Sequence, residues 1–384
     1  MKSIPQIRFL EFSGEWVEKR LGEVCEIVMG QSPDSKFYNQ NKNGLPLIQG
    51  ANDFEKINNY TTQITKSCEK NDIIMSVRAP VGTLTKAKQK SCIGRGVCAI
   101  KGNDFIYYVL IKNQRKLKIY SQGTTFEAIN SKDLKSLKIH IPPTLEEQQK
   151  IASFLSSIDE KIDIVSKKIE KLKEYKKGIM QKLLNVKNKE PELRFPEFSG
   201  KWVEKRLGEV LKERKKYTIK NNGFIHLTLS KKGVFPKTDQ FNRDFLVTSK
   251  DKKYKITYLN DICYNPANLK FGVICRNKYG NGIFSPIYVT FEVNNSNPIF
   301  IENIVTSERF IKKALKYQEG TVYERMAVKP EDLLRLSIFI PPTIEEQQKI
   351  ASFLSSIDEK IELNEQVLDK MKEYKRGLLQ KMFV

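Results

Sequence analysis

Two stretches of the chain carry apolar residues at alternating steps of four and three. They run from Ile151 to Leu183 and from Ile350 to Met382. This spacing places the apolar side chains on one face of a helix and is typical of a coiled-coil seam. Pro-Pro and a Thr-x-x-Glu capping box precede each stretch, at Thr144 and Thr343. The pattern therefore predicts two helices of about 40 residues, near 60 Å each.

The predicted seam positions of the first helix are Ile151, Leu155, Ile158, Ile162, Val165, Ile169 and Leu172, continuing through Tyr175, Ile179 and Leu183. Those of the second helix are Ile350, Leu354, Ile357, Ile361, Asn364, Leu368 and Met371, continuing through Tyr374, Leu378 and Met382. The polar member, Asn364, is either a device that fixes register or a tolerated surface position.

The length of the connection predicts how the two helices pair. Residues 185–190, the unrepeated link after the first helix, span only about 20 Å when fully extended. That is too short to return along a helix of this length. We therefore expect an antiparallel pair, with the second helix beginning where the first ends.

Two regions outside the helices, 25–140 and 211–339, have short apolar runs separated by turn residues. Strands are expected at 72–77 and 97–100 in the first region and at 261–264 and 286–292 in the second. An amphipathic helix is expected near 105–120 and again near 301–316. Each region then has a Gly-Thr turn, at Gly123 and Gly320. The shared order predicts one mixed α/β fold with different loops.

The chain contains this plan twice. Pro5–Val24 returns as Pro191–Val210 with 16 of 20 positions identical, and Ile141–Ile162 returns as Ile340–Ile361 with 21 of 22 identical. The regions between these segments show no comparable identity, so the repeated frame has one role twice while each variable region has its own. Recent duplication followed by uneven drift is the alternative explanation.

The predicted class is α+β, with two mixed α/β domains separated by a pair of long antiparallel coiled-coil helices and a pseudo-two-fold internal repeat. The expected segments are 1–143 (variable core 25–140), helix 144–184, linker and second domain 185–342 (variable core 211–339), and helix 343–384. We call residues 25–140 variable region one and residues 211–339 variable region two.

The positive charge is concentrated in the variable regions. The chain has 67 basic and 45 acidic residues, for a net charge of +22. Variable region one has 18 basic and 9 acidic residues, and variable region two has 23 and 12. The frame is nearly neutral. Lysine that served only solubility would not segregate in this way, so the charge predicts a surface for a polyanion on each variable region.

The sequence offers little for catalysis or metal binding. The six cysteines and two histidines are scattered without zinc-site spacing, so reduced, mostly buried thiols are expected, although spacing alone leaves a Cys–His nucleophile pair open. There is no P-loop motif. Asn265-Pro266-Ala267-Asn268 faintly resembles the Asn-Pro-Pro-Tyr signature of adenine methyltransferases, but a turn is the preferred interpretation. With no secretory signal and no long apolar span, a cytoplasmic location is expected.

The repeated motifs resemble those of the specificity subunit of type I restriction–modification systems. The resemblance covers essentially the whole chain. The residues that carry it are Pro142-Pro143-x-x-Glu146-Glu147-Gln148-Gln149-x-Ile151-Ala152 and its copy at Pro341–Ala351, Leu193–Phe198 with Trp202 and Leu207-Gly208, Asn71–Ile74, Asn260–Ile262, and Gly282–Tyr288. Variable region one departs from the pattern, because Cys92–Gly96 replaces the Ser-Pro-x-Tyr segment.

The resemblance implies a subunit that recognises DNA and has no catalytic activity of its own. Each of two target-recognition domains would read one half of a bipartite sequence in double-stranded DNA. The helices would set the spacer and dock two methyltransferase subunits, which restriction subunits would join. Adenosylmethionine, ATP and Mg²⁺ would belong to those partners, leaving this chain with no cofactor and no metal. A stand-alone DNA-modifying enzyme (an adenine methyltransferase or a nuclease) and a coiled-coil scaffold without a DNA role are the alternatives.

Basic side chains in loops are the candidate DNA contacts, arginine mainly for bases and lysine mainly for phosphates. For each one, a solvated surface charge is the alternative. The candidates are Arg78, Lys86, Lys88, Lys90, Arg95, Lys231, Lys232, Arg243, Lys270 and Arg276.

Overall fold

The chain forms two compact units that each include part of both long helices. The computed structural model describes residues 3–121, 128–219, 223–237, 253–319 and 326–384. Unit 1 comprises Met1–Lys167 and Glu365–Val384, and unit 2 comprises Lys168–Asn364. Helix α5 (Leu145–Leu184, 40 residues) continues from unit 1 into unit 2, and helix α9 (Ile344–Lys381, 38 residues) from unit 2 into unit 1. The units therefore divide midway along the helices, whereas the sequence-based boundaries fall at the helix starts.

Variable region one contains a four-stranded and a five-stranded sheet. The four-stranded sheet has the order β2 (Glu26–Met29), β10 (Val97–Lys101), β7 (Ile73–Ser76), β8 (Leu84–Lys86), and every pair in it is antiparallel. The five-stranded sheet has the order β3 (Tyr38–Asn39), β5 (Asn59–Thr61), β4 (Leu45–Ile48), β9 (Ser91–Ile93), β6 (Ser67–Cys68), with β4 and β9 parallel. The helical elements of this region are η1 (Ser35–Phe37), η2 (Ala51–Asp53), α2 (Asp104–Lys112), α3 (Gln114–Ser121) and α4 (Ser131–Ser136). Helix α1 (Leu21–Val24) lies directly before the region.

Variable region two repeats the four-stranded sheet strand for strand. Its order is β15 (Leu211–Glu213), β23 (Val289–Val293), β20 (Ile262–Tyr264), β21 (Ile274–Arg276). The five-stranded sheet has the order β16 (Tyr217–Ile219), β19 (Lys253–Thr257), β22 (Gly282–Phe284), β17 (Ile225–Ser230), β18 (Gly233–Pro236), with β17 and β22 parallel. The helical elements are η3 (Leu207–Glu209), η6 (Pro266–Phe271), α6 (Pro298–Val305), α7 (Glu308–Ala314), η7 (Leu315–Tyr317) and α8 (Pro330–Arg335). The two regions share one fold and differ at the edges of the larger sheet.

Short strand pairs connect each variable region to the frame. Strand β1 (Val17–Arg20) pairs with β11 (Lys138–Ile141), and β14 (Val203–Arg206) pairs with β24 (Ser337–Ile340) in the same antiparallel register. A hairpin of β12 (Val186–Lys187) and β13 (Glu190–Pro191) follows α5. Because β11 and β24 lead directly into α5 and α9, each variable region is attached at the start of one long helix.

The single helices expected after the sheets are both interrupted. The stretch 105–120 forms α2 and α3, which are separated at Asn113. The stretch 301–316 forms α6, α7 and η7, with a break at Thr306. Side-chain caps explain the second break, because the Ser307 hydroxyl accepts a hydrogen bond from Phe310 N and starts a new helix. The expected Gly-Thr turns at Gly123 and Gly320 lie outside the described residues.

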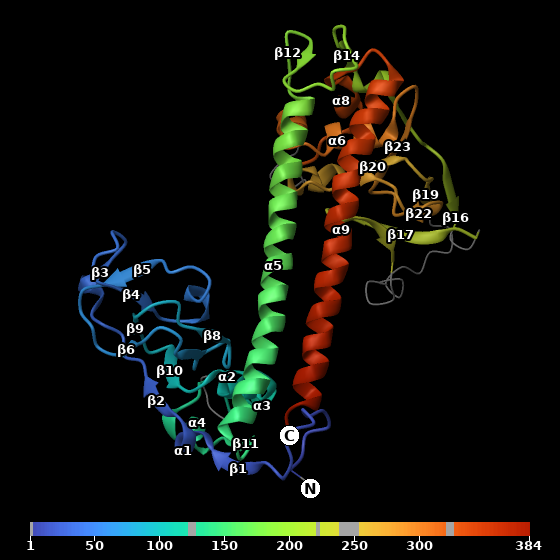
Figure 1. The fold of residues 1–384 in the computed structure, drawn as a ribbon. Coiled ribbons are helices and arrows are strands. Elements are labelled where there is room, and N and C mark those ends of the chain that lie inside the picture. The colour runs from blue at the N-terminus through green and yellow to red at the C-terminus, as the bar shows by residue number, and fades with distance from the viewer. Residues whose placement is uncertain (1–2, 122–127, 220–222, 238–252, 320–325) are drawn as a thin grey trace. The chain divides into compact units, whose positions relative to one another are not determined.

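Within each unit the two long helices run antiparallel (Figure 1). In unit 1, Ile151, Leu155 and Ile158 share a core with Leu378 and Met382. In unit 2, Leu183 lies in one core with Ile350 and Leu354. Most other predicted seam residues are also buried or half-buried: Ile162, Val165, Ile169, Leu172, Ile357, Ile361, Asn364, Leu368 and Met371.

Two positions assigned to the seam are wrong. Tyr175 and Tyr374 are 51% and 58% exposed. A helix of 3.6 residues per turn drifts away from a strict 3.5-residue repeat, and the position that faces the other helix is the next one, Lys176, whose ammonium bonds to Asp358. The Asn364 amide donates to Lys360 O at 2.6 Å, on its own helix.

The Thr-x-x-Glu sequences form only half of the predicted capping box. Glu147 N donates to the Thr144 hydroxyl at 3.4 Å, but the Glu147 carboxylate is buried and accepts hydrogen bonds from Arg8 and Trp16 instead. Glu346 is held in the same way by Arg194 and the indole of Trp202. The expectation that this glutamate is mainly a capping group is therefore wrong, because its charge anchors the segment that precedes the variable region.

In the described part of the chain, no helix has the length and apolar character needed to cross a membrane.

Candidate nucleic-acid interface

The four-stranded sheet of each variable region has one end at which strand-connecting loops meet. In variable region one this end lies where Ser76 of β7 pairs with Val97 of β10, and in variable region two where Tyr264 of β20 pairs with Val289 of β23. We call it the loop edge. At the other end of the sheet, β7 and β20 begin and β8 and β21 finish.

Two candidate arginines lie together at the loop edge of variable region one. Arg78 follows β7 and Arg95 precedes β10. Val77 N donates to Gly96 O at 2.9 Å, which joins the two loops. Both arginines are exposed, and neither guanidinium has an ion-pair partner among the described residues. The loop edge therefore presents two cationic groups that are open to a ligand.

The three candidate lysines of variable region one lie at the opposite end of the sheet. Lys86 ends β8, opposite Ile73 at the start of β7. Lys86 pairs with Asp104 at 2.8 Å and Lys90 with Glu69 at 2.6 Å, whereas Lys88 is exposed. The structure thus divides the five candidates into two groups that the sequence does not distinguish.

Variable region two has lysines at its loop edge. Lys231 and Lys232 form the exposed turn between β17 and β18, and Lys270 lies in η6, directly after β20. A Cβ placed on Gly272, two residues after Lys270, would lie 3.7 Å from Lys231 Cε. The turn and η6 are therefore neighbours. Arg243 lies outside the described residues.

Arg276 has a structural partner that the sequence did not reveal. Its guanidinium pairs with Glu302 at 3.0 Å and donates to Asn260 Oδ1 at 2.7 Å, and its side chain is 12% exposed. Arg276 occupies the place in β21 that Lys86 occupies in β8. Both cations thus hold a β-strand against the first helix after the sheet, through Glu302 and Asp104, and are poorly placed for a base contact.

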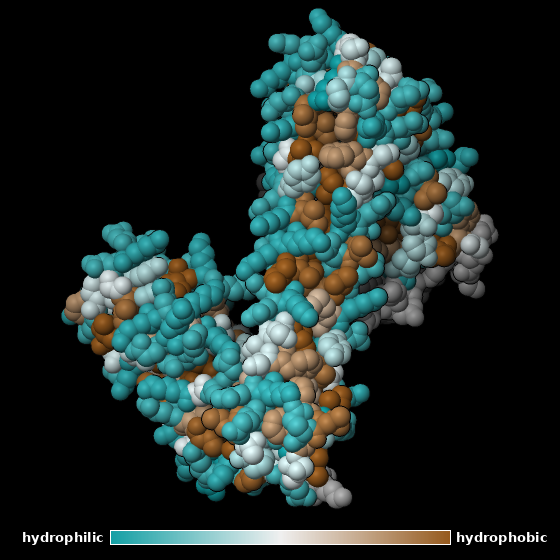
Figure 2. Space-filling model, in the orientation of Figure 1, coloured by the Kyte–Doolittle hydropathy of each residue, from teal (hydrophilic) through white to brown (hydrophobic). Residues whose placement is uncertain are grey.

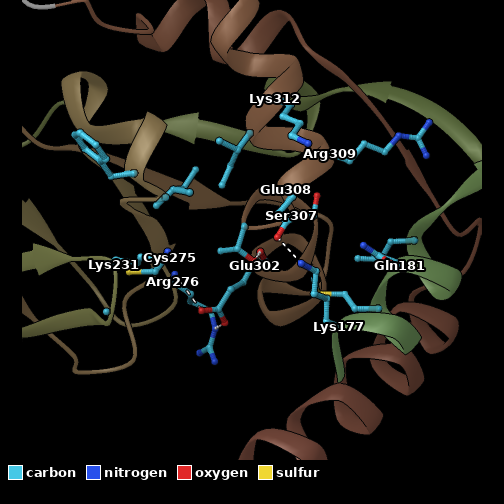
Figure 3. A pocket seen from close by; sticks show the side chains of 18 of the residues that line it. Lys177, Gln181, Lys231, Cys275, Arg276, Glu302, Ser307, Glu308, Arg309 and Lys312 are labelled. Atoms are coloured by element: carbon cyan, nitrogen blue, oxygen red, sulfur yellow. Dashed lines mark hydrogen bonds and ion pairs between the residues drawn. The ribbon is translucent and has the colours of Figure 1, made fainter. Parts of the chain in front are cut away.

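A cleft of about 1570 Å³ lies within unit 2 beside this loop edge. The turn carrying Lys231 and Lys232 lines one part of the cleft. The last turns of α5 and the first turns of α7 line another part. Figure 3 shows Lys177 of α5 directed at Glu308 of α7, a pair separated by 2.7 Å. Lys177 is thereby paired, and the positive charge of the cleft comes both from the loop-edge lysines and from Lys182, Arg309 and Lys312 of the two helices.

Two apolar side chains at the loop edge of variable region two were missed in the sequence. Phe271 and Ile287 are each 61% exposed. Phe271 ends η6, and the Lys270 ammonium lies 5.1 Å from its ring centre. Ile287 lies in the Ser285–Tyr288 turn between β22 and β23. The sequence offered one signal for these exposed side chains, namely a large apolar residue within a Pro-containing turn, where no core can cover it.

All six cysteine side chains lie in the protein interior. All six are free and buried, which confirms the expectation of reduced, buried thiols. Burial raises the pKa of Cys25 to about 11 and that of Cys98 to about 12. A thiol must ionise to act as a nucleophile, so these two groups are unreactive near neutral pH.

The Asn265-Pro266-Ala267-Asn268 segment is a helix start. The Asn265 side chain accepts a hydrogen bond from Ala267 N at 3.1 Å and caps η6. Only 8% of Asn265 is exposed, which favours the turn interpretation over a base-binding motif. Within the described ranges, no group of three or more His, Cys, Asp or Glu side chains could hold a metal ion.

The fold and the paired loop edges define a protein with two related recognition modules on a helical frame. The family model described as "Type I restriction modification DNA specificity domain" matches residues 13–174 and 199–373. The chain belongs to this family, and the two matches correspond to two target-recognition domains.

Curated relatives carry the same description. A putative type I restriction enzyme MjaX specificity subunit from Methanocaldococcus jannaschii is 40% identical over 198 residues, which is 48% of this chain and 46% of that protein. The type I restriction enzyme MjaVIII specificity subunit from the same organism is 24% identical over 98% of this chain and 94% of its own length.

Solved structures agree with the fold. The type I restriction–modification S subunit from M. genitalium superposes with a TM-score of 0.67 at 17% identity, covering 99% of both chains. A chain from a structure on complex assembly and conformational transition of the type I restriction–modification system gives a TM-score of 0.51 at 15% identity, covering 96% of this chain and 97% of that one.

Proposed function

We propose that the chain is the non-catalytic DNA-recognition subunit of a type I restriction–modification complex, and that each variable region reads one half of a bipartite target. The observation that carries the proposal is the placement of exposed cations at one equivalent site. Arg78 and Arg95 in variable region one and Lys231 and Lys270 in variable region two all lie at the loop edge. Phosphate contacts need such cations, and arginine can also recognise base edges.

The frame would determine how the two readings are combined. Each variable region joins the start of a long helix through a strand pair of the same register. The attachment is therefore the same in both halves, whereas the loops of the two variable regions differ. In this proposal the paired helices fix the number of unread base pairs between the half-sites. Family membership supports this division of roles.

The helices also have a repeated exposed surface suited to partner subunits. Ile164 and Leu363, at equivalent positions of α5 and α9, are 64% and 61% exposed, and the equivalent tyrosines Tyr175 and Tyr374 are 51% and 58% exposed. Apolar residues are visible along the long helices in Figure 2, between mostly hydrophilic neighbours. We infer that two methyltransferase subunits dock there and that restriction subunits join them. Adenosylmethionine, ATP and Mg²⁺ would then be bound by those subunits.

Methylation mapping tests this proposal directly. The chain is produced with its methyltransferase partner in a host without methylation of its own, and modified positions are sequenced genome-wide. A split motif with a fixed unread spacer is expected. A continuous motif, or no sequence preference, would contradict bipartite recognition.

Two controls address the alternative classes. The purified chain is incubated alone with adenosylmethionine and duplex DNA, and no methyl transfer is expected; transfer would identify an enzyme. The complex is also titrated with DNA at rising salt concentration. Affinity should fall steeply, because binding releases counterions from the phosphates and this release is less favourable at high salt. Salt-independent or absent binding would favour a scaffold without a DNA role.

A further inference from the structure

The loop edge of variable region one contains a rigid turn that presents a single arginine. Arg95 lies between Gly94 and Gly96, in the turn that connects β9 to β10. Gly94 N donates to Ile48 O at 2.8 Å, and Arg95 N donates to the Ser32 hydroxyl at 3.1 Å. Because Val77 N also donates to Gly96 O at 2.9 Å, the backbone on both sides of Arg95 is fixed by other segments of the region.

A close backbone contact requires glycine at position 96, and side chains pack tightly against position 94. A Cβ at position 96 would lie 2.0 Å from Gln49 O, and one at position 94 would lie 3.1 Å from both Gln49 Cγ and Ser32 Oγ. Gly30 approaches the same turn, since a Cβ there would lie 2.1 Å from Gly94 O. The segments around residues 30, 49 and 94 thus pack tightly against one another, and Arg95 lies at the exposed tip of the turn.

The surroundings of this arginine differ from those of the other cations of the sheet. Lys86 is neutralised by Asp104, whereas Arg95 has no ion-pair partner in the part of the chain that the structure describes. The neighbouring side chains are the hydroxyl of Ser32 and the amide of Gln49, and the Gln49 amide is already bonded to Tyr38 at 2.8 Å. Because the backbone of the turn is already fixed, binding would have to order only the Arg95 side chain and not the turn itself.

Variable region two presents a different chemical group at the equivalent turn. Between β22 and β23 the tip is Pro286-Ile287, and Ile287 is 61% exposed. The strand before this turn pairs in parallel with β17, as β9 pairs with β4. The turns therefore correspond, and one offers a bidentate hydrogen-bond donor where the other offers an apolar surface.

We propose that Arg95 is a specificity-determining residue that recognises one guanine in the half-site read by variable region one. The proposal rests on the proposed DNA-reading function and assigns one contact within it. Arginine donates two hydrogen bonds to O6 and N7 of guanine in the major groove, a pattern that no other base offers. The apolar tip of variable region two cannot make this contact, so the two half-sites are read by different chemistry.

The experiment uses the complex of the full chain with its methyltransferase partner. Wild type, Arg95→Ala, Arg95→Lys and the control Arg20→Ala are each used to select DNA from a duplex library. In this library the half-site of variable region one is randomised and the other half-site is fixed by methylation mapping. Arg20 is an exposed arginine of β1, outside variable region one, and its replacement removes the same charge. Circular dichroism and thermal unfolding establish that each variant is folded.

Wild type and Arg20→Ala are expected to prefer guanine at one position by about 5- to 150-fold. In Arg95→Ala that preference should fall to about 3-fold or less, at that position only, and in Arg95→Lys it should weaken, because lysine keeps the charge but not the planar fork. A uniform loss of affinity in Arg95→Ala that Arg95→Lys restores would overturn the proposal and make Arg95 a phosphate contact. An unchanged preference would also overturn it. If wild type itself selects no sequence, the proposed function fails, which is a distinct result.

Discussion

Nζ of Lys176 in α5 lies 2.6 Å from Oδ1 of Asp358 in α9, within unit 2. Lys375 and Asp159, each 199 positions away from its equivalent, form the same pair in unit 1. The repeat therefore reproduces an interaction between the helices, with donor and acceptor exchanged between α5 and α9. Each unit thereby has a polar bond that specifies antiparallel pairing where the apolar seam is interrupted.

Replacing Asp358 by Asn should lower the free energy of unfolding by about 1 kcal/mol. The pair is partly exposed, with side chains 24% and 34% accessible, so solvent screening keeps the effect near the upper end of that for surface pairs. Urea unfolding measures it. Asp163→Asn, which removes a pair with Lys167 on a single helix, is the control and should cost less than about 0.5 kcal/mol. Equal effects would show that the interhelical pair has no special role.

Replacing Glu346 by Gln should destabilise unit 2 by about 3 kcal/mol. The carboxylate is 1% exposed and pairs with Arg194 at 2.7 Å, so its neutralisation leaves a largely buried guanidinium without a counter-charge. Thermal unfolding of the full chain is the measurement. The neighbouring Glu345 is exposed, and Glu345→Gln should leave the transition nearly unchanged. A similar small effect for both variants would argue against an anchoring role.

Replacing Lys231 or Lys270 by Ala should weaken DNA binding by similar factors for every sequence. A lysine at a phosphate contributes counterion release and no base recognition, so removing one such lysine should decrease the slope of log affinity against log salt by about 0.9. Fluorescence anisotropy on the complex with its methyltransferase provides both values. Lys329, which pairs with Glu319 at 2.8 Å, is the matched control. A change of sequence preference in Lys231→Ala would contradict the phosphate assignment.

Extending both long helices by one turn should lengthen the unread spacer of the target. One turn adds about 5.4 Å, and a base pair rises about 3.4 Å, so an increase of one or two base pairs is expected. The insertions are placed midway along α5 and α9 to preserve the antiparallel contacts. Methylation mapping reports the new motif. An unchanged spacer with unchanged half-sites would show that the helices do not set the distance.

The buried thiols should make stability fall at alkaline pH. Because burial raises the pKa of Cys25 to about 11 from a usual value of 9.0, the folded chain holds a proton that the unfolded chain releases. Its contribution to stability is complete below about pH 9 and is lost as pH rises toward about 11. Urea titrations at pH 8 and pH 10.5 should show this decrease in stability, and the decrease should be smaller in Cys25→Ala.

At pH 8 a thiol reagent should modify the six buried cysteines only after denaturant is added.

The frame was predictable because its determinants are local and repeated. Helix starts were indicated by Thr144 and Thr343, and the helix lengths by continuous apolar spacing. The antiparallel direction followed from the length of one linker. These features depend on periodicity and chain geometry, which a sequence displays directly.

The errors arose where tertiary contacts override local pattern. Glu147 matched a capping box, yet Arg8, far away in sequence, captures its carboxylate. Tyr175 fits the heptad but is displaced from the seam by helix drift. Among the DNA candidates, Arg276 and Arg95 look alike as sequence, and only the position of Glu302 distinguishes the neutralised cation from the exposed one. Pairing of charges across a sheet is not encoded within any short window.

The order in which the chain is synthesised has different consequences for the two units. Unit 2 is one continuous segment, so all of its core is available before residues 365–384 leave the ribosome. Unit 1 begins first but needs Leu378, Met382 and Phe383 for its core, and Ile7 N bonds to Lys381 O at 2.9 Å. The core of unit 1 therefore cannot be complete until residues 378–383 have been synthesised, and removal of residues 378–384 would take side chains out of that core.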